Sequence, residues 1–184
     1  MAVYDEARIN TPRLLLRPPQ LSDLDPWAVM MTDEDTARYI GGVMPRAVTW
    51  RALMTVIGAW HAHGFSMFSV IEKSTGRWIG RIGPWMPEGW QGTEIGWSLV
   101  RDAWGHGYAT EAATAATDWA IDHLGWTDII HSIDPRNTAS QEVAKRLGST
   151  NRGPGTLPPP YHDSVIDIWG QSRDQWRARR GTVG

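Results

Sequence analysis

The segment Val100–Glu111, VRDAWGHGYATE, says most about the fold of this 184-residue sequence. Before it, residues 93–100 predict a strand. After it, apolar residues recur three and four positions apart along one helical face, at Ala109, Ala113, Ala116, Ala120 and Leu124. Gly105 and Gly107 occupy the turn between the strand and the helix, where the missing Cβ lets a ligand approach the backbone. The segment therefore predicts a strand, a glycine turn and a helix that ends at Gly125.

The beginning of this helix is a candidate anion site. The first N–H groups of a helix have no intrahelical partner, and together with the helix dipole they attract a phosphate or pyrophosphate. A tight turn whose glycines serve only the backbone geometry explains the same residues equally well. Neither G-x-x-x-x-G-K-[ST] nor G-x-G-x-x-G is present, because Thr110 stands at the third glycine position of the second motif.

The rest of the chain alternates predicted strands and helices. Strands are predicted over residues 13–17, 65–71, 77–82, 127–133 and 164–169. Helices are predicted over residues 24–31, 49–61, 138–147 and 173–180. Ser22 is the predicted N-cap of the first helix, Thr138 opens a capping box with Gln141, and residues 153–160 predict a loop. This order favours one α+β (mixed α/β) domain over residues 1–184, with a core at about 11–172 and a C-terminal tail or helix at 173–184.

Composition excludes several classes of protein. The net charge of -2 gives no basic field for a nucleic-acid backbone. The absence of cysteine excludes disulfides, thiolate metal sites and a cysteine nucleophile. No apolar stretch approaches the ~20 residues that span a bilayer, and residues 1–10 do not resemble a secretory signal. We therefore expect a cytoplasmic protein with no metal, no nucleic-acid partner and no membrane partner, either a monomer or a homodimer.

Four segments resemble the GNAT superfamily of N-acetyltransferases. WGHGYA (residues 104–109) is similar to the pyrophosphate loop of that family, [Gln/Arg]-x-x-Gly-x-[Gly/Ala]. The longer string WGHGYATEA resembles the branch of the ribosomal-protein N-terminal acetyltransferases, as do TPRLLLRP (11–18), EIGW (94–97) and DPRN (134–137), the last followed by Ser140 and by Leu147 and Gly148. The four matches follow the order and the approximate spacing of the family. The resemblance implies an acetyltransferase whose central, mostly antiparallel sheet splays apart between strands 93–100 and 127–133.

The resemblance also implies where acetyl-CoA binds. Its pyrophosphate would lie on the backbone amides of Gly105, His106, Gly107, Tyr108, Ala109 and Thr110. The pantetheine arm would pair with the unpaired peptide groups of Leu99 and Val100 in the gap between the two strands, as an added strand would. Asn137 matches an asparagine that helps to hold this arm. A neutral amine would then attack the thioester in a ternary complex; the acceptor is a protein N-terminus or a small-molecule amine.

Two residues are candidates for the chemistry. Glu94 shares a strand face with Gly96, Ser98 and Val100, and the resembling branch has a glutamate there, so it is a candidate base acting through water. A solvent-exposed carboxylate, or one paired with Arg81, is the structural alternative. Many members of the superfamily carry a tyrosine where this chain has Ala144, and the resemblance implies that Ser140 protonates the leaving thiolate instead. A serine in the first turn of a helix also occurs for capping alone.

Several other features keep two interpretations. Trp104 replaces the usual Gln or Arg of the loop, and Ser149 replaces a phenylalanine. His131 fits a buried core histidine better than a catalytic base. Residues 33–35 (DED) fit a solvated charge run better than a site that attracts a cationic acceptor. The remaining alternatives are an acetyltransferase for an amino sugar, polyamine or antibiotic, a non-catalytic acyl-CoA sensor, and a nucleotide-binding protein. We expect the acceptor pocket to come from the loops around 33–46, 84–92 and 153–163.

Overall fold

A single twisted sheet forms the centre of the molecule in a computed structural model that describes residues 7–181. Its eight strands follow the order β1-β2-β3-β4-β5-β6-β8-β7. The strands are β1 (Ile9–Asn10), β2 (Leu14–Arg17), β3 (Phe68–Glu72), β4 (Trp78–Trp85), β5 (Glu94–Leu99), β6 (Asp128–Ile133), β7 (Thr150–Gly155) and β8 (Ile166–Ser172). Every neighbouring pair is antiparallel except β5 and β6, which are parallel. The predicted mixed α/β class with a mostly antiparallel sheet is confirmed.

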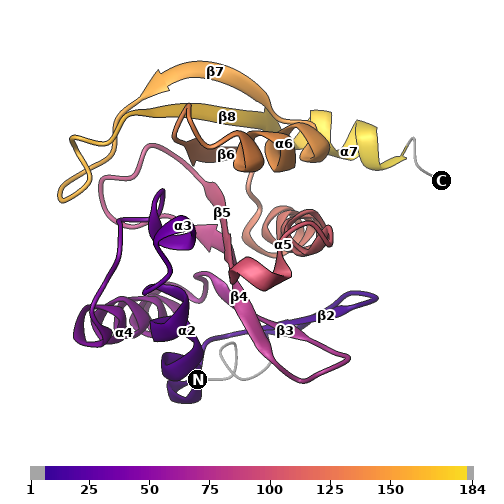
Figure 1. The fold of residues 1–184 in the computed structure, drawn as a ribbon. Coiled ribbons are helices and arrows are strands. Elements are labelled where there is room, and N and C mark those ends of the chain that lie inside the picture. Colours follow the sequence, from indigo (N-terminus) through magenta and orange to yellow (C-terminus); the bar gives the residue numbers. More distant parts are fainter. Residues whose placement is uncertain (1–6, 182–184) are drawn as a thin grey trace.

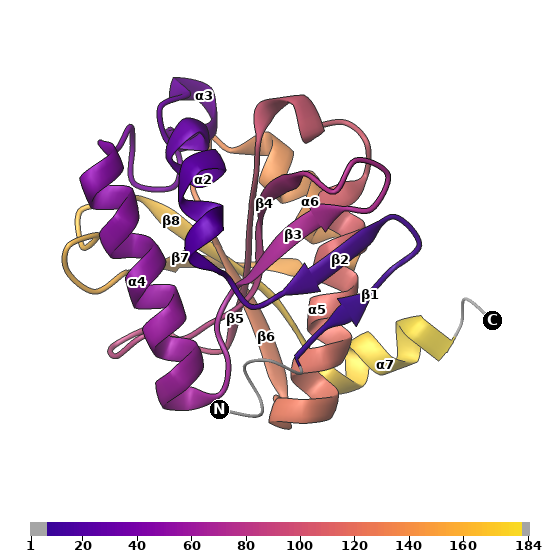
Figure 2. The same ribbon diagram turned by 90° about the horizontal axis from the view of Figure 1, so that it is seen from below.

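Helices cover both faces of this sheet. They are α2 (Leu24–Met30), α3 (Glu34–Ala37), α4 (Arg46–His63), α5 (Tyr108–Leu124), α6 (Thr138–Leu147) and α7 (Arg173–Gly181), with 3-10 turns at Leu21–Asp23 and Arg101–Ala103. Figure 2 shows α2 and α4 on one side of the strands and α5 on the other. The predicted alanine face of α5 is buried and packs against β4 and β5. Because alanine side chains are small, the α5 axis lies close to the strands that lead into the glycine turn.

The sheet opens between β5 and β6. Only one pair of residues, Glu94 and Ile130, is in register between the two strands, and the Ile130 N–H donates to the Thr93 carbonyl at 3.0 Å. Beyond this point the strands diverge, so that β6, β8 and β7 form a separate group at the top of Figure 1. The expected splay between residues 93–100 and 127–133 is therefore present, and its wide end faces the glycine turn.

Local predictions were wrong at several positions. Ser22 caps no helix, because the chain makes a 3-10 turn over Leu21–Asp23 and α2 follows directly from Asp23. Residues 153–155 belong to β7 rather than to a loop; a register shift between Asn151 and Pro154 accommodates the proline against β8. The N-cap of α6 is Asn137 and not Thr138, because the Asn137 side chain accepts from the Ser140 N–H. The strand β1 was not predicted.

The ends of the chain limit two further comparisons. The expected absence of a secretory signal concerns residues 1–10, of which residues 1–6 lie outside the described part, and residues 182–184 of the predicted tail lie outside it as well. Within residues 7–181, no helix is long and apolar enough to cross a membrane.

Candidate active site

A large cavity of about 1610 Å³ brings most of the predicted site residues together. Those that line it are Glu94, Leu99, Gly105, Gly107, Tyr108, Ala109, Thr110, Asn137 and Ser140. Val100 and His106 do not line it, and the Val100 N–H donates to the Ile79 carbonyl of β4 at 2.9 Å. The cavity is also lined by residues 38–45, by Trp85, Pro87, Glu88 and Trp90, and by residues 157–161, which fall within the three segments expected to form an acceptor pocket.

The glycine turn shapes the entrance to α5. Gly105 and Gly107 both have φ of 77°, a left-handed conformation that other residues adopt only with strain. A Cβ on Gly105 would meet nothing within 4 Å, so the backbone conformation rather than space requires the glycine there. Gly107 is the N-cap of the 17-residue helix α5 and provides no capping side chain. The first bond along the helix is from the Glu111 N–H to the Gly107 carbonyl, so the N–H groups of residues 108–110 remain open to an anion.

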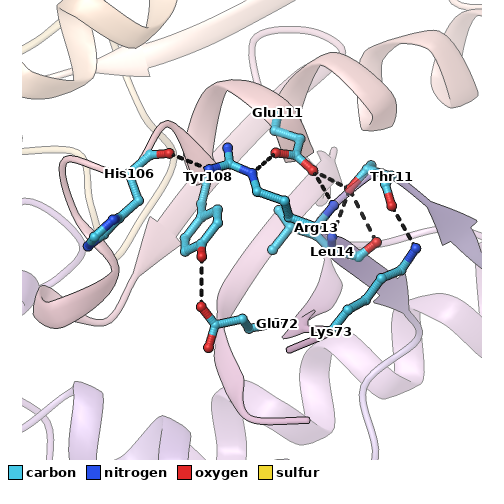
Figure 3. A network of polar contacts seen from close by, with 8 residues as sticks. All are labelled: Thr11, Arg13, Leu14, Glu72, Lys73, His106, Tyr108 and Glu111. Atoms are coloured by element: carbon cyan, nitrogen blue, oxygen red, sulfur yellow. Dashed lines mark hydrogen bonds and ion pairs between the residues drawn. The ribbon is translucent and has the colours of Figure 1, made fainter. Parts of the chain in front are cut away.

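Side chains from the turn between β1 and β2 brace the glycine turn, as Figure 3 shows. The Arg13 guanidinium donates to the His106 carbonyl at 2.9 Å and to the Glu111 carboxylate at 2.7 Å, and it lies 4.5 Å from the centre of the Tyr108 ring. Thr11 donates to the same carboxylate at 2.6 Å. Burial alone would raise the pKa of Glu111, but the hydrogen bonds from Thr11 and Arg13 outweigh it and lower that pKa. Sequence reasoning missed this brace, although its residues stand inside two of the quoted motifs.

Peptide groups of β5 face the gap toward β6. In an antiparallel ladder successive residues point their N–H and C=O groups alternately to opposite sides. Because Val100 bonds to β4, the peptide groups of Leu99 and Trp97 point away from β4. Trp104, the unusual residue of the loop, donates from Nε1 to the Leu99 carbonyl at 2.9 Å. The Leu99 N–H and the Trp97 peptide groups are therefore available for an extended, amide-bearing ligand.

Glu94 lies at the closed end of this gap and is buried, with 7% of its surface exposed. Its Oε2 accepts from Trp90 Nε1 at 2.7 Å and from Ser132 Oγ at 2.6 Å. Burial raises the pKa of Glu94 to about 6, against the opposing effect of the hydrogen bonds from Ser132 and Trp90. Both structural alternatives, a solvent-exposed carboxylate and an ion pair with Arg81, were wrong. The partners Trp90 and Ser132 carried no signal in the sequence.

Ser140 stands across the cavity at the start of α6. Its Oγ accepts from Trp97 Nε1 at 3.2 Å, which leaves the hydroxyl proton free to donate. Asn137 Oδ1 accepts from the Ser140 N–H at 3.1 Å, so this asparagine fixes the first turn of α6. Ala144 is fully buried and offers no proton to the cavity.

The other candidate residues, His131 and the acidic residues Asp33 and Asp35, have structural partners instead. His131 donates from Nδ1 to the Ile95 carbonyl at 2.7 Å and approaches Ser149 Oγ through Nε2 at 3.0 Å, and burial lowers its pKa to about 4. It is a neutral core histidine. Asp33 accepts from the Thr36 N–H, and Asp35 pairs with Arg38 and Arg101, so these carboxylates already have partners. Their side chains give no reason to expect a cationic acceptor.

The open helix terminus and the splayed strands fit an acyl-CoA-dependent acetyltransferase. The model of the acetyltransferase (GNAT) domain matches residues 13–150, and the chain belongs to the GNAT acetyltransferase family. A protein of Bacillus licheniformis named uncharacterized N-acetyltransferase p20 is 30% identical over 148 residues, which span 79% of this chain and 83% of that protein. The GNAT family uses acetyl-CoA as the acyl donor.

Solved structures share the fold. The acetyltransferase from Agrobacterium tumefaciens str. C58 has a TM-score of 0.78 and 29% identity over 89% of this chain and 93% of that chain. A putative ribosomal-protein-serine acetyltransferase from Vibrio cholerae has a TM-score of 0.76 over 91% of this chain and 98% of that chain. At 18% identity the second comparison shows the common fold alone. Within residues 7–181, no group of three or more His, Asp or Glu side chains is placed to hold a metal ion.

Proposed function

We propose that this enzyme transfers an acetyl group from acetyl-CoA to a primary amine, by direct attack of the amine in a ternary complex. The observation that carries the proposal is the position of Glu94, a buried carboxylate with a pKa raised to about 6, in the same cavity as the open N-terminus of α5. One end of the cavity can bind an anion, and the other end contains Glu94, which can accept a proton.

The chain's own peptide groups fit the coenzyme. The N–H groups at residues 105–110 would hold the diphosphate, because they are unpaired and lie at the positive end of a 17-residue helix. The Leu99 N–H faces the gap where the pantetheine arm would lie, and Asn137 borders the same space. When bound, acetyl-CoA supplies the acetyl group as a thioester. The Leu99 N–H would stabilise negative charge that develops on the carbonyl oxygen of this thioester.

Glu94 would act on the amine. Lysine amines have a pKa of about 10.4 and α-amines about 7.7–8.0, so the attacking amine must lose a proton near neutral pH. A carboxylate with a pKa of about 6 is ionised at pH 7.5 and is a stronger base than an ordinary glutamate. Trp90 and Ser132 both bond to Oε2, which leaves Oε1 to accept a proton, directly or through a water.

Ser140 would act on the leaving thiolate. Its accepting side is occupied by Trp97 Nε1, so the hydroxyl is oriented to donate. The serine lies one turn before Ala144, which cannot perform this step.

Release of the CoA thiol with a panel of amines tests the proposal. The panel contains N-terminal peptides, amino acids, polyamines and amino sugars, and each product is checked by mass for one added acetyl group. We expect amine-dependent thiol release at a rate well above hydrolysis. Binding of CoA without turnover of any amine would instead identify an acyl-CoA sensor, and stronger thermal protection by ATP or NAD than by CoA would identify a nucleotide site.

A further inference from the structure

Arg81 is a charged side chain for which residues 7–181 provide no carboxylate partner. It lies on β4, its guanidinium stacks 4.9 Å from the centre of the Trp27 ring, and Nη1 contacts Met67 Sδ at 3.4 Å. Among residues 7–181, no carboxylate forms an ion pair with it, and its Nε is buried without a hydrogen-bond partner. Arg17 shows the usual arrangement in this fold, because it bonds to both carboxylate oxygens of Asp23 at 2.8 and 2.6 Å.

An arginine in this position lowers the stability of the folded protein unless an anion binds to it. Burial lowers the pKa of Arg81 to about 10, so the side chain remains charged at neutral pH. A buried charge without a partner destabilises a protein, and a planar guanidinium pairs best with a carboxylate through two parallel hydrogen bonds. Glu94 does not provide that partner, because no ion pair or hydrogen bond joins the two side chains in residues 7–181, and its Oε2 bonds to Trp90 and Ser132.

Arg81 faces the same cavity as the proposed base. It is the cross-strand neighbour of Ser98, and Ser98 follows Glu94 by four residues, so all three side chains lie on one face of the sheet. The contact with Trp27 identifies this as the face covered by α2, opposite α5. Both Arg81 and Glu94 line the cavity. Glu94 and Ser98 are about 13 Å apart along the strand.

We propose that the acceptor is an amine that also carries a carboxylate, which Arg81 binds through its guanidinium while the amine lies beside Glu94. This inference rests on the proposed acetyl transfer. The distance along the strand requires several bonds between the two groups, as in a long ω-amino acid or in a peptide with an acidic side chain near its N-terminus. A polyamine is a poor acceptor in this arrangement, because its second cation would face Arg81.

Paired acceptors that differ only in charge test the proposal. The free amino acids are 4-aminobutanoate, 6-aminohexanoate and 8-aminooctanoate, each compared with its carboxamide. The peptides are Ala-Asp-Ala-amide and Ala-Asn-Ala-amide, and spermidine is the cationic probe. For at least one pair we expect kcat/KM to be about 10- to 100-fold higher for the carboxylate, as a charge-assisted hydrogen-bonded pair provides. The pair with the larger ratio identifies a free amino acid or a peptide as the source of the carboxylate.

Two variants show whether Arg81 is responsible. Arg81→Met should reduce the ratio to about 1, while Arg51→Met, which removes an exposed arginine of α4, should leave it unchanged. Thermal unfolding of Arg81→Met should occur at the wild-type temperature or above it, because the variant removes a partly buried charge whose Nε makes no hydrogen bond within residues 7–181. Arg81→Lys keeps the charge but not the planar fork, so it should lower the ratio only in part; this variant replaces Arg81→Met if the latter does not fold.

The outcomes separate this inference from the proposed function. No turnover of any amine by the wild-type enzyme would refute the acetyl transfer itself. Turnover with a carboxylate-to-carboxamide ratio near 1 for every pair, or preferred turnover of spermidine, would leave the acetyl transfer standing and overturn the role of Arg81. A ratio that survives in Arg81→Met would do the same.

Discussion

The substitution Glu94→Gln should make the protein more stable at neutral pH while it removes the proposed base. The pKa of Glu94 is about 6 in the folded protein and 4.5 in the reference state. As the pH rises, the unfolded chain therefore loses this proton first, and the folded state loses stability between about pH 4.5 and 6. The difference of ~1.5 in pKa means that ionised Glu94 lowers the free energy of unfolding by ~2 kcal/mol above pH 6. Glutamine is neutral at every pH, and its carbonyl oxygen can accept from both Trp90 and Ser132.

Urea unfolding at pH 4.0 and pH 7.5 measures this effect. At pH 4.0 the variant and the wild-type protein should have nearly equal free energies of unfolding, and at pH 7.5 the variant should be more stable by about 2 kcal/mol. Glu88→Gln is the matched control, because it removes an exposed carboxylate from the loop that carries Trp90. A stability difference for Glu94→Gln that is equal at the two pH values, or a less stable variant at pH 7.5, would contradict the burial argument.

The same variant links this pKa to catalysis. General base catalysis is worth about 10²- to 10⁴-fold, so kcat/KM should fall by about that factor at pH 7.5 while the affinity for CoA stays nearly constant. The wild-type kcat/KM should rise with pH through about 6, and the variant should lose this limb of the profile. Equal loss of turnover and of CoA affinity would remove Glu94 from the role of base.

Two further substitutions test the other parts of the site. Gly107→Ala should weaken CoA binding and lower the free energy of unfolding by ~1–2 kcal/mol, because φ of 77° strains a residue with a Cβ. Calorimetric titration measures the first effect and urea unfolding the second. A variant with the wild-type affinity for CoA would show that the turn does not need its left-handed geometry. Ser140→Ala should lower kcat by about 10²-fold or more, with KM for the amine little changed, in steady-state assays; an unchanged kcat would leave Ser140 only its contacts with Trp97 and Asn137.

The strongest sequence signals depended on local physics, and those predictions hold. Gly105 and Gly107 mark a left-handed turn, and the alanine spacing marks the buried face of α5, because both features follow from neighbouring residues alone. The two-residue strand β1 is too short to produce a pattern. The sequence of β7 contains Gly153 and Pro154, which predict a loop, and only pairing with β8 makes this segment a strand.

The chemistry of the site was harder to predict than its location. The position of Glu94 could be proposed from the resemblance, but its burial depends on Trp90 from a loop and Ser132 from a strand 38 residues away. Burial raises the pKa of this carboxylate, which in water would have the pKa of an ordinary glutamate. The sequence also contained no sign that Arg81 lacks a carboxylate partner within residues 7–181, because this depends on how the whole described fold packs around it. Long-range packing decides both features.

A crystal structure with bound CoA tests the central claim most directly. The account predicts diphosphate oxygens within about 2.7–3.2 Å of the N–H groups of Tyr108, Ala109 and Thr110, with the pantetheine arm between β5 and β6 and the thiol end directed toward Glu94 and Ser140. CoA bound elsewhere, with side chains closed over the beginning of α5, would contradict it.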